Sequence, residues 1–258
     1  MLLGELIAEL RNNILHDRSD RIADSTSDYL WTDETLVRYI DEAQIRLAAE
    51  GFVIRDGSNP LVTEVTLVEG QTIYPLHPSV IAVMSARYDT DVHDLGRAGH
   101  SIFNQTRTTE QWTWEATLAT MITPGRPSAY STDEQVSADA DDDTQMIVNL
   151  RVYPPPSAAE VGKKLYLRVA RLPLEKLDLS YEDIQVPEVP RMHHLPMLDW
   201  AAYLALRIVD TDGGNPSRAR EFAASFELYV KKARKHALRK MFAPVAWNFG
   251  RAGWGWER

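Results

Sequence analysis

The hydrophobic pattern of this chain changes its period twice, and that change limits the folds available to it. Apolar residues recur at helical spacing near the N-terminus, alternate as in β-strands through the middle, and return to helical spacing near the C-terminus. No segment repeats with a fixed period. The pattern predicts an α+β fold, in which N- and C-terminal helices form a helical bundle and an antiparallel β-rich domain is inserted between them.

The N-terminal segment predicts two helices. Residues 2–16 form the first. The second begins after Thr32, whose hydroxyl can cap free N–H groups, and we expect Gly51 to be the residue just beyond its end. One stripe of this helix should be buried: Leu36, Ile40, Ala43 and Leu47.

The middle of the chain predicts β-strands separated by turns. Alternating or β-branched runs mark five of them: 62–67, 71–74, 80–88, 146–153 and 163–171. A meander or a small sandwich would accommodate these strands.

The C-terminal part predicts two further helices. The first spans residues 190–210, with one apolar face: Leu195, Leu198, Ala202, Leu206 and Val209. Asn215 should cap the second helix, Pro216 should take its first position, and the helix should end near Met241. The expected parts are therefore 1–51 and 187–242 for the bundle, 52–186 for the β-rich domain, and 243–258 for an extended C-terminal arm.

The motifs of common enzymes and cofactor sites do not occur in this sequence. There is no cysteine, which excludes disulfides and thiolate chemistry, and there is no glycine-rich nucleotide motif or G-x-S-x-G turn. The acidic run at 139–143 lacks the glycine and the final acid of a calcium loop. Because His193 and His194 are adjacent, we expect histidines at the start of a helix or on the surface rather than a zinc pair. We therefore expect no enzyme, cofactor, bound metal, signal peptide or membrane span.

Charge is distributed unevenly along the chain. The net charge is −9, and residues 215–258 carry +7 while the rest carries −16. The basic residues gather in the last predicted helix: Lys231, Lys232, Arg234, Lys235, Arg239 and Lys240. They could contact an acidic partner or DNA phosphates, or they could only complement the helix dipole as a solvated face.

The last sixteen residues combine aromatic side chains with glycine. Glycine gives this tail no regular structure of its own, whereas tryptophan is enriched at the centres of protein interfaces. We interpret the tail as a docking arm with these contact residues: Trp247, Phe249, Arg251, Trp254 and Trp256. Folding back onto the bundle and stacking on nucleic-acid bases remain the alternatives.

Two stretches resemble a known protein family. Residues 30–44, LWTDETLVRYIDEAQ, resemble the pattern W-[ST]-D-x-x-L-x-x-Y-[IL]-[ND]-x-A-Q of the head-to-tail adaptor (connector) proteins of short-tailed bacteriophages, the group of tail tubular protein A-like subunits. Residues 195–229 resemble the paired C-terminal helices of that family, and 186–188 resemble the segment that leads into them. Together these stretches cover about a third of the chain, and the β-rich middle matches only in kind.

The resemblance implies a structural protein of the virion, made in the host cytoplasm. It implies a homo-oligomeric ring, expected to be a dodecamer, beneath the portal protein, with the C-terminal arm reaching the portal. The ring would extend the DNA channel and receive tail nozzle or tail fibre proteins. Genomic DNA would pass through without sequence-specific binding, and an acidic channel wall would repel its phosphates.

Two other functions fit the same residues. One is a different virion component, such as a head-completion or tail-terminator subunit. The other is a nucleic-acid-binding module that uses the basic helix and the tail, although a pI of about 5.3 is low for such a domain.

Overall fold

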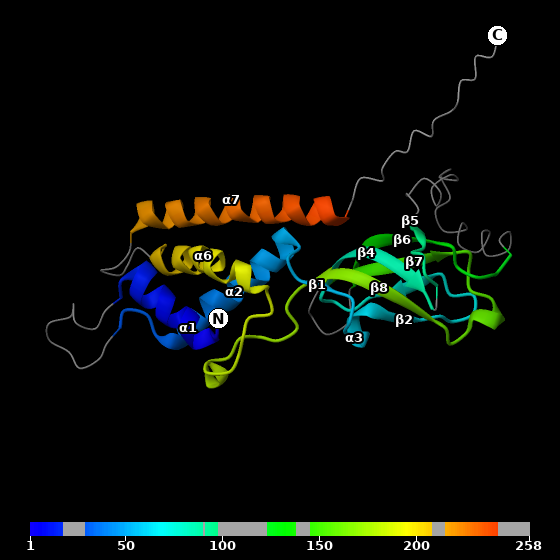
Figure 1. The fold of residues 1–258 in the computed structure, drawn as a ribbon, viewed down its shortest axis with the longest axis horizontal. Coiled ribbons are helices and arrows are strands. Elements are labelled where there is room, and N and C mark those ends of the chain that lie inside the picture. Colours follow the sequence, from blue (N-terminus) through cyan, green and yellow to red (C-terminus); the bar gives the residue numbers. More distant parts are fainter. Residues whose placement is uncertain (18–28, 90, 98–122, 138–144, 208–214, 242–258) are drawn as a thin grey trace, which may run out of the picture.

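The computed structural model describes residues 1–17, 29–89, 91–97, 123–137, 145–207 and 215–241. Helices from the two ends of the chain lie together, and the strands lie beside them (Figure 1). The fold is α+β, as the sequence predicts. Among the helices of the described residues, none combines the length and apolarity that crossing a bilayer requires.

Four long helical segments build the bundle. They are α1 (Leu3–Glu9) with its π-helical continuation η1 (Leu10–Leu15), α2 (Asp33–Gly51), α6 (His194–Leu206) and α7 (Pro216–Met241). Short helical turns lie elsewhere: α3 (Pro60–Thr63), η3 (Ala158–Glu160), η4 (Leu179–Tyr181) and η5 (Arg191–His193). Helices α6 and α7 contact each other and α2, and α1 packs on the other side of α2 and α6.

The bundle core follows the predicted stripes. All four side chains of the α2 stripe are fully buried, and Thr32 caps the helix by accepting the Thr35 N–H at 3.3 Å. In α6 one prediction is wrong, because Leu195 is 53% exposed and its neighbour His194 takes the buried position of that turn. Val209 lies outside the described residues.

The end of α2 differs from the prediction. Helix α2 includes Gly51, and the left-handed residue beyond it is Phe52 with φ 52°. A Cβ at Gly51 would lie 3.2 Å from Cγ1 of Val53, which is a tight contact, and 3.6 Å from Cβ of Ala233 on α7, which is an ordinary one.

The strands form two four-stranded sheets. In the first, β8 (Lys164–Arg171) pairs along one edge with β4 (Val80–Tyr88) and along the other with β1 (Arg55–Asp56) and β2 (Glu64–Thr66). The second has the order β3 (Ile73–Pro75), β7 (Gln145–Tyr153), β6 (Ala129–Ser137) and β5 (Gly96–Arg97). All pairs are antiparallel except β5 with β6.

Side chains from both sheets share one buried cluster, which is the arrangement of a small sandwich. The strand expected at 62–67 is shorter than predicted. Asn59 accepts the Leu61 N–H at 3.1 Å and Pro60 takes the first helical position, so α3 forms there before β2 begins at Glu64.

The buried hydrophobic residues thus divide into a helical cluster and a β cluster. Val53, Ile54, Leu177 and Val189 belong to the helical cluster, although they lie in or next to the predicted β-rich segment. The domain boundaries at 51/52, 186/187 and 242/243 stay predictions.

Candidate docking surfaces

The basic half of α7 is one candidate surface. The helix begins where Oδ1 of Asn215 accepts the Arg218 N–H at 3.0 Å, with Pro216 in the first position, as the sequence predicts. Its buried side chains recur on one face: Ala219, Phe226, Val230 and Ala237. The opposite face of α7 is left to solvent.

Most of the predicted basic residues share that outer face. Five of them are exposed, and four of these lie opposite the buried stripe: Lys231, Lys232, Lys235 and Arg239. Within the described part of the chain, none of the four forms an ion pair. Arg234 points elsewhere, with its guanidinium 5.5 Å from the ring centroid of Phe52. Lys240 belongs to α7, but its side chain lies outside the described set.

The predicted docking arm lies outside the described residues. This holds for all five of its proposed contact residues: Trp247, Phe249, Arg251, Trp254 and Trp256. Helix α7 ends at Met241 beside the junction between the bundle and the sheets (Figure 1). The role of the arm stays a prediction.

A hollow of about 490 Å³ marks the junction itself. Its lining comes from the end of α2, from β1, from the segment 188–193, and from Ala233 and His236 on α7. Arg171, the last residue of β8, is one of its lining residues. The Arg171 guanidinium donates to Oδ2 of Asp56 at 2.8 Å and to Oε2 of Glu188 at 2.5 Å.

The ion pairs of Arg171 join the two parts of the fold. Asp56 lies on β1, whereas the Glu188 N–H donates to Oε1 of Gln44 on α2 at 2.8 Å. Burial alone would raise the pKa of Asp56, but hydrogen bonds from Ser58, Arg171 and Asn59 outweigh it and lower that pKa to about 2. The carboxylate is therefore charged across the whole physiological range.

The adjacent histidines lie at the start of a helix, as predicted, but they are buried rather than on the surface. His193 is 9% and His194 1% exposed. Nδ1 of His193 lies 2.8 Å from the Tyr229 hydroxyl on α7, and His194 bridges the N-terminal amino group and the Val189 carbonyl. Burial lowers the pKa of both rings, and nearby positive charges lower it further, although the hydrogen bond to the Val189 carbonyl acts to raise the pKa of His194.

No group of three metal-ligating side chains occurs within the described ranges. Two other histidines form local hydrogen bonds: Nδ1 of His77 lies 2.8 Å from Oγ of Ser79, and Nδ1 of His16 lies 3.2 Å from the Asn12 carbonyl oxygen. The acidic run 139–143 and His100 lie outside the described residues.

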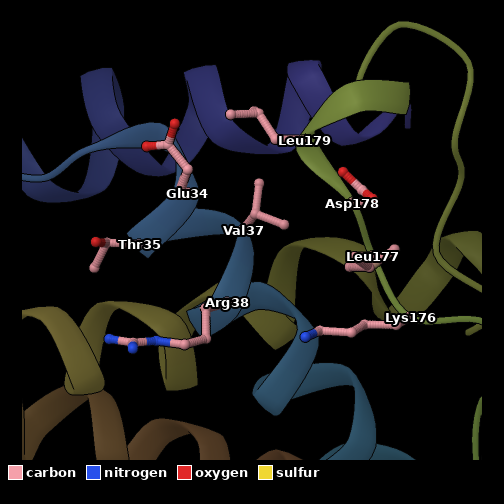
Figure 2. Close-up of a pocket in the computed structure, with 8 residues that line it drawn as sticks. All are labelled: Glu34, Thr35, Val37, Arg38, Lys176, Leu177, Asp178 and Leu179. Carbon is pink, nitrogen blue, oxygen red and sulfur yellow. The ribbon is translucent and has the colours of Figure 1, made fainter.

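A second hollow, also about 490 Å³, lies between the first turns of α2 and the segment 176–179 (Figure 2). Val37, Leu177 and Leu179 contribute its apolar lining, and charged side chains of both signs surround them: Glu34, Arg38, Lys176 and Asp178. At its edge, Asp41 accepts the Leu177 N–H at 3.1 Å, and burial raises the pKa of this carboxyl despite that bond and the nearby Lys176. The segment is thereby fixed against α2.

Sequence reasoning missed two of these features. Arg171 and the segment 174–186 belong to no sequence motif, because they form hydrogen bonds with residues more than a hundred positions away in the chain. The only sequence signal is the group of acids within 175–183.

The comparison with known families agrees with the interpretation of these surfaces as contacts with other proteins. The sequence matches the family described as SU10 adaptor protein over residues 1–247, which is nearly the whole chain. No curated protein matches it. The chain therefore belongs to the SU10 adaptor protein family, and it is a phage head-to-tail adaptor, a structural component of the virion.

Proposed function

We propose that this protein forms a ring beneath the portal of a phage head, extends the DNA channel and provides the attachment site for the tail. The family match over residues 1–247 carries the proposal. The fold agrees with it, because the helices from both chain ends leave charged and apolar faces exposed. Its partners would be the portal protein, tail nozzle or tail fibre proteins, and further copies of itself, twelve in a complete ring.

The arm 243–258 is proposed to dock on the portal. Docking would use the aromatic side chains as anchors and the glycines to adapt to the pocket.

The basic residues of α7 are proposed to contact a partner or the DNA that passes through the ring. Acidic residues elsewhere would line the channel and repel phosphates, so that the genome slides without sequence-specific binding. The net charge of −16 outside residues 215–258 supports an acidic wall.

Mass measurement by light scattering tests the proposal. The purified protein is measured alone and then after mixing with portal rings of the same phage. Addition in a fixed multiple of subunits per portal ring is the expected result. A protein that never joins the portal ring contradicts the proposal, and salt-dependent binding to DNA would then favour the nucleic-acid-binding alternative.

A further inference from the structure

The helical bundle has two opposite faces that carry opposite charge. Helix α7 covers one side, and α1 with the segment 174–186 covers the other, with α2 and α6 between them (Figure 1). The segment is fixed to α1 by backbone hydrogen bonds from Leu3 to Gln185 (2.9 Å) and from Gly4 to Glu182 (3.0 Å). Both faces therefore have a fixed position on the bundle.

The face formed by residues 174–186, called here the acidic face, is both charged and apolar. Four acids and one lysine give it a net charge of −3. Glu175, Asp178 and Asp183 are exposed. Four large apolar side chains of the segment are exposed as well: Leu174 (37%), Tyr181 (56%), Ile184 (73%) and Val186 (50%).

The outer surface of α7 from Leu228 to Arg239, called here the basic face, has the opposite charge and a similar mixture. Lys231, Lys232 and Lys235 are exposed with no ion pair among the described residues. Leu228 lies one turn before them and is 56% exposed.

We propose that the basic face of one subunit binds the acidic face of the next subunit in the ring. This inference rests on the proposed function and names the surfaces that would join its copies. Two different patches on opposite sides of a subunit are what head-to-tail association requires. Complementary charge selects the pairing, and the exposed apolar side chains form the buried centre of the contact.

Binding of a second copy of this chain accounts for both faces, whereas binding of DNA accounts only for the charge of the basic face. DNA would neutralise the lysines but would leave Leu228 and the apolar side chains of the acidic face without a role. A second copy of this chain satisfies both faces, and each subunit in a closed ring uses each face once.

Charge reversal with rescue tests the pairing in the full-length chain. The first variant carries Lys231→Glu, Lys232→Glu and Lys235→Glu, the second Glu175→Lys and Asp183→Lys, and the third carries all five changes. We expect the first and second variants alone to lower the number of subunits assembled on portal rings at least about tenfold, because like charges then face each other.

The third variant, and an equimolar mixture of the first and second, should assemble as the native chain does, since every contact again joins opposite charges. Rescue also shows that the variants are folded. Glu69→Lys, an exposed reversal in the β region, serves as the control that leaves assembly unchanged.

The other outcomes separate the two claims. Normal assembly of the first and second variants overturns the pairing but leaves the adaptor function intact. The pairing is also overturned if the first variant assembles normally yet loses binding to DNA, because the basic face then serves nucleic acid. A native chain that associates neither with itself nor with the portal overturns both claims.

Discussion

Arg171 is the residue on which the joint between the bundle and the sheets depends most directly. It belongs to β8 and reaches Asp56 on β1 and Glu188 beside α2. Its side chain is 11% exposed, so the ion pairs are largely shielded from solvent. Removing one member of such a group leaves charged partners without compensation.

Replacing Arg171 with methionine should lower the free energy of unfolding by about 2–3 kcal/mol, since two largely buried carboxylates lose their partner. Urea denaturation measures this change. Arg168→Met on the same strand is the matched control, because Arg168 is exposed and its loss should change stability by less than about 0.5 kcal/mol. Equal effects of the two substitutions would show that the ion pairs at the joint contribute nothing.

The buried histidines make stability depend on pH. The pKa of His193 and His194 is lowered in the folded protein from 6.5, chiefly by burial, so the unfolded chain binds more protons as the pH falls. The two rings therefore favour folding above the unfolded pKa and lose that contribution as the pH drops below about 6.5. Asp41 and Asp199, whose pKa burial raises, act in the opposite sense.

Thermal unfolding between pH 7.5 and 5.5 should accordingly show a smaller loss of stability in the double variant His193→Gln, His194→Gln than in the native chain. The comparison of slopes cancels the contribution of the carboxyl groups. An unchanged slope in the double variant would mean that the pair does not titrate with folding.

Among the elements, α7 has two separate roles on its two faces. Its inner face joins the bundle core, where Phe226 is fully buried and lies 5.3 Å from Trp200 between ring centroids. Its outer face takes no part in the core, which leaves that face free to contact another molecule.

Replacing one side chain on each face of α7 with alanine should separate these two roles. Phe226→Ala removes a fully buried ring and should lower the free energy of unfolding by about 3–4 kcal/mol. Leu228→Ala, two residues along the same helix, should cost less than about 0.5 kcal/mol in the monomer because that side chain is 56% exposed. Chemical denaturation of both variants checks the contrast, and a large cost at Leu228 would show that the outer face supports the fold itself.

At the scale of the whole molecule, the buried hydrophobic side chains form two clusters, one in the helical bundle and one in the sheets. Among the described residues, the buried side chains of the helical cluster extend along α7 as far as Val230.

Deletion of residues 243–258 should leave the unfolding temperature of the monomer unchanged but abolish its addition to portal rings. Calorimetry measures the first quantity and light scattering the second. A drop in the unfolding temperature would instead show that the arm folds back on its own bundle.

The sequence by itself determined the elements whose signals are local. The Thr32 cap and the four-residue stripe predicted the start and the buried face of α2, and Asn215 with Pro216 predicted the start of α7. Capping bonds and helical periodicity involve residues within a few positions of each other. The strands at 80–88, 146–153 and 163–171 also agree closely with β4, β7 and β8. Residues 30–44 and 195–229 indicated the family.

Only the tertiary structure decided what depends on distant partners. β8 lies between β4 on one side and β1 and β2 on the other, and no local signal specifies that register. The burial of His194 beside the amino group of Met1, and the joint at Arg171, depend on contacts across 193 and 115 positions. The sequence contains the charges of α7 and of residues 174–186, but only the packing places these two segments on opposite sides of α2 and α6.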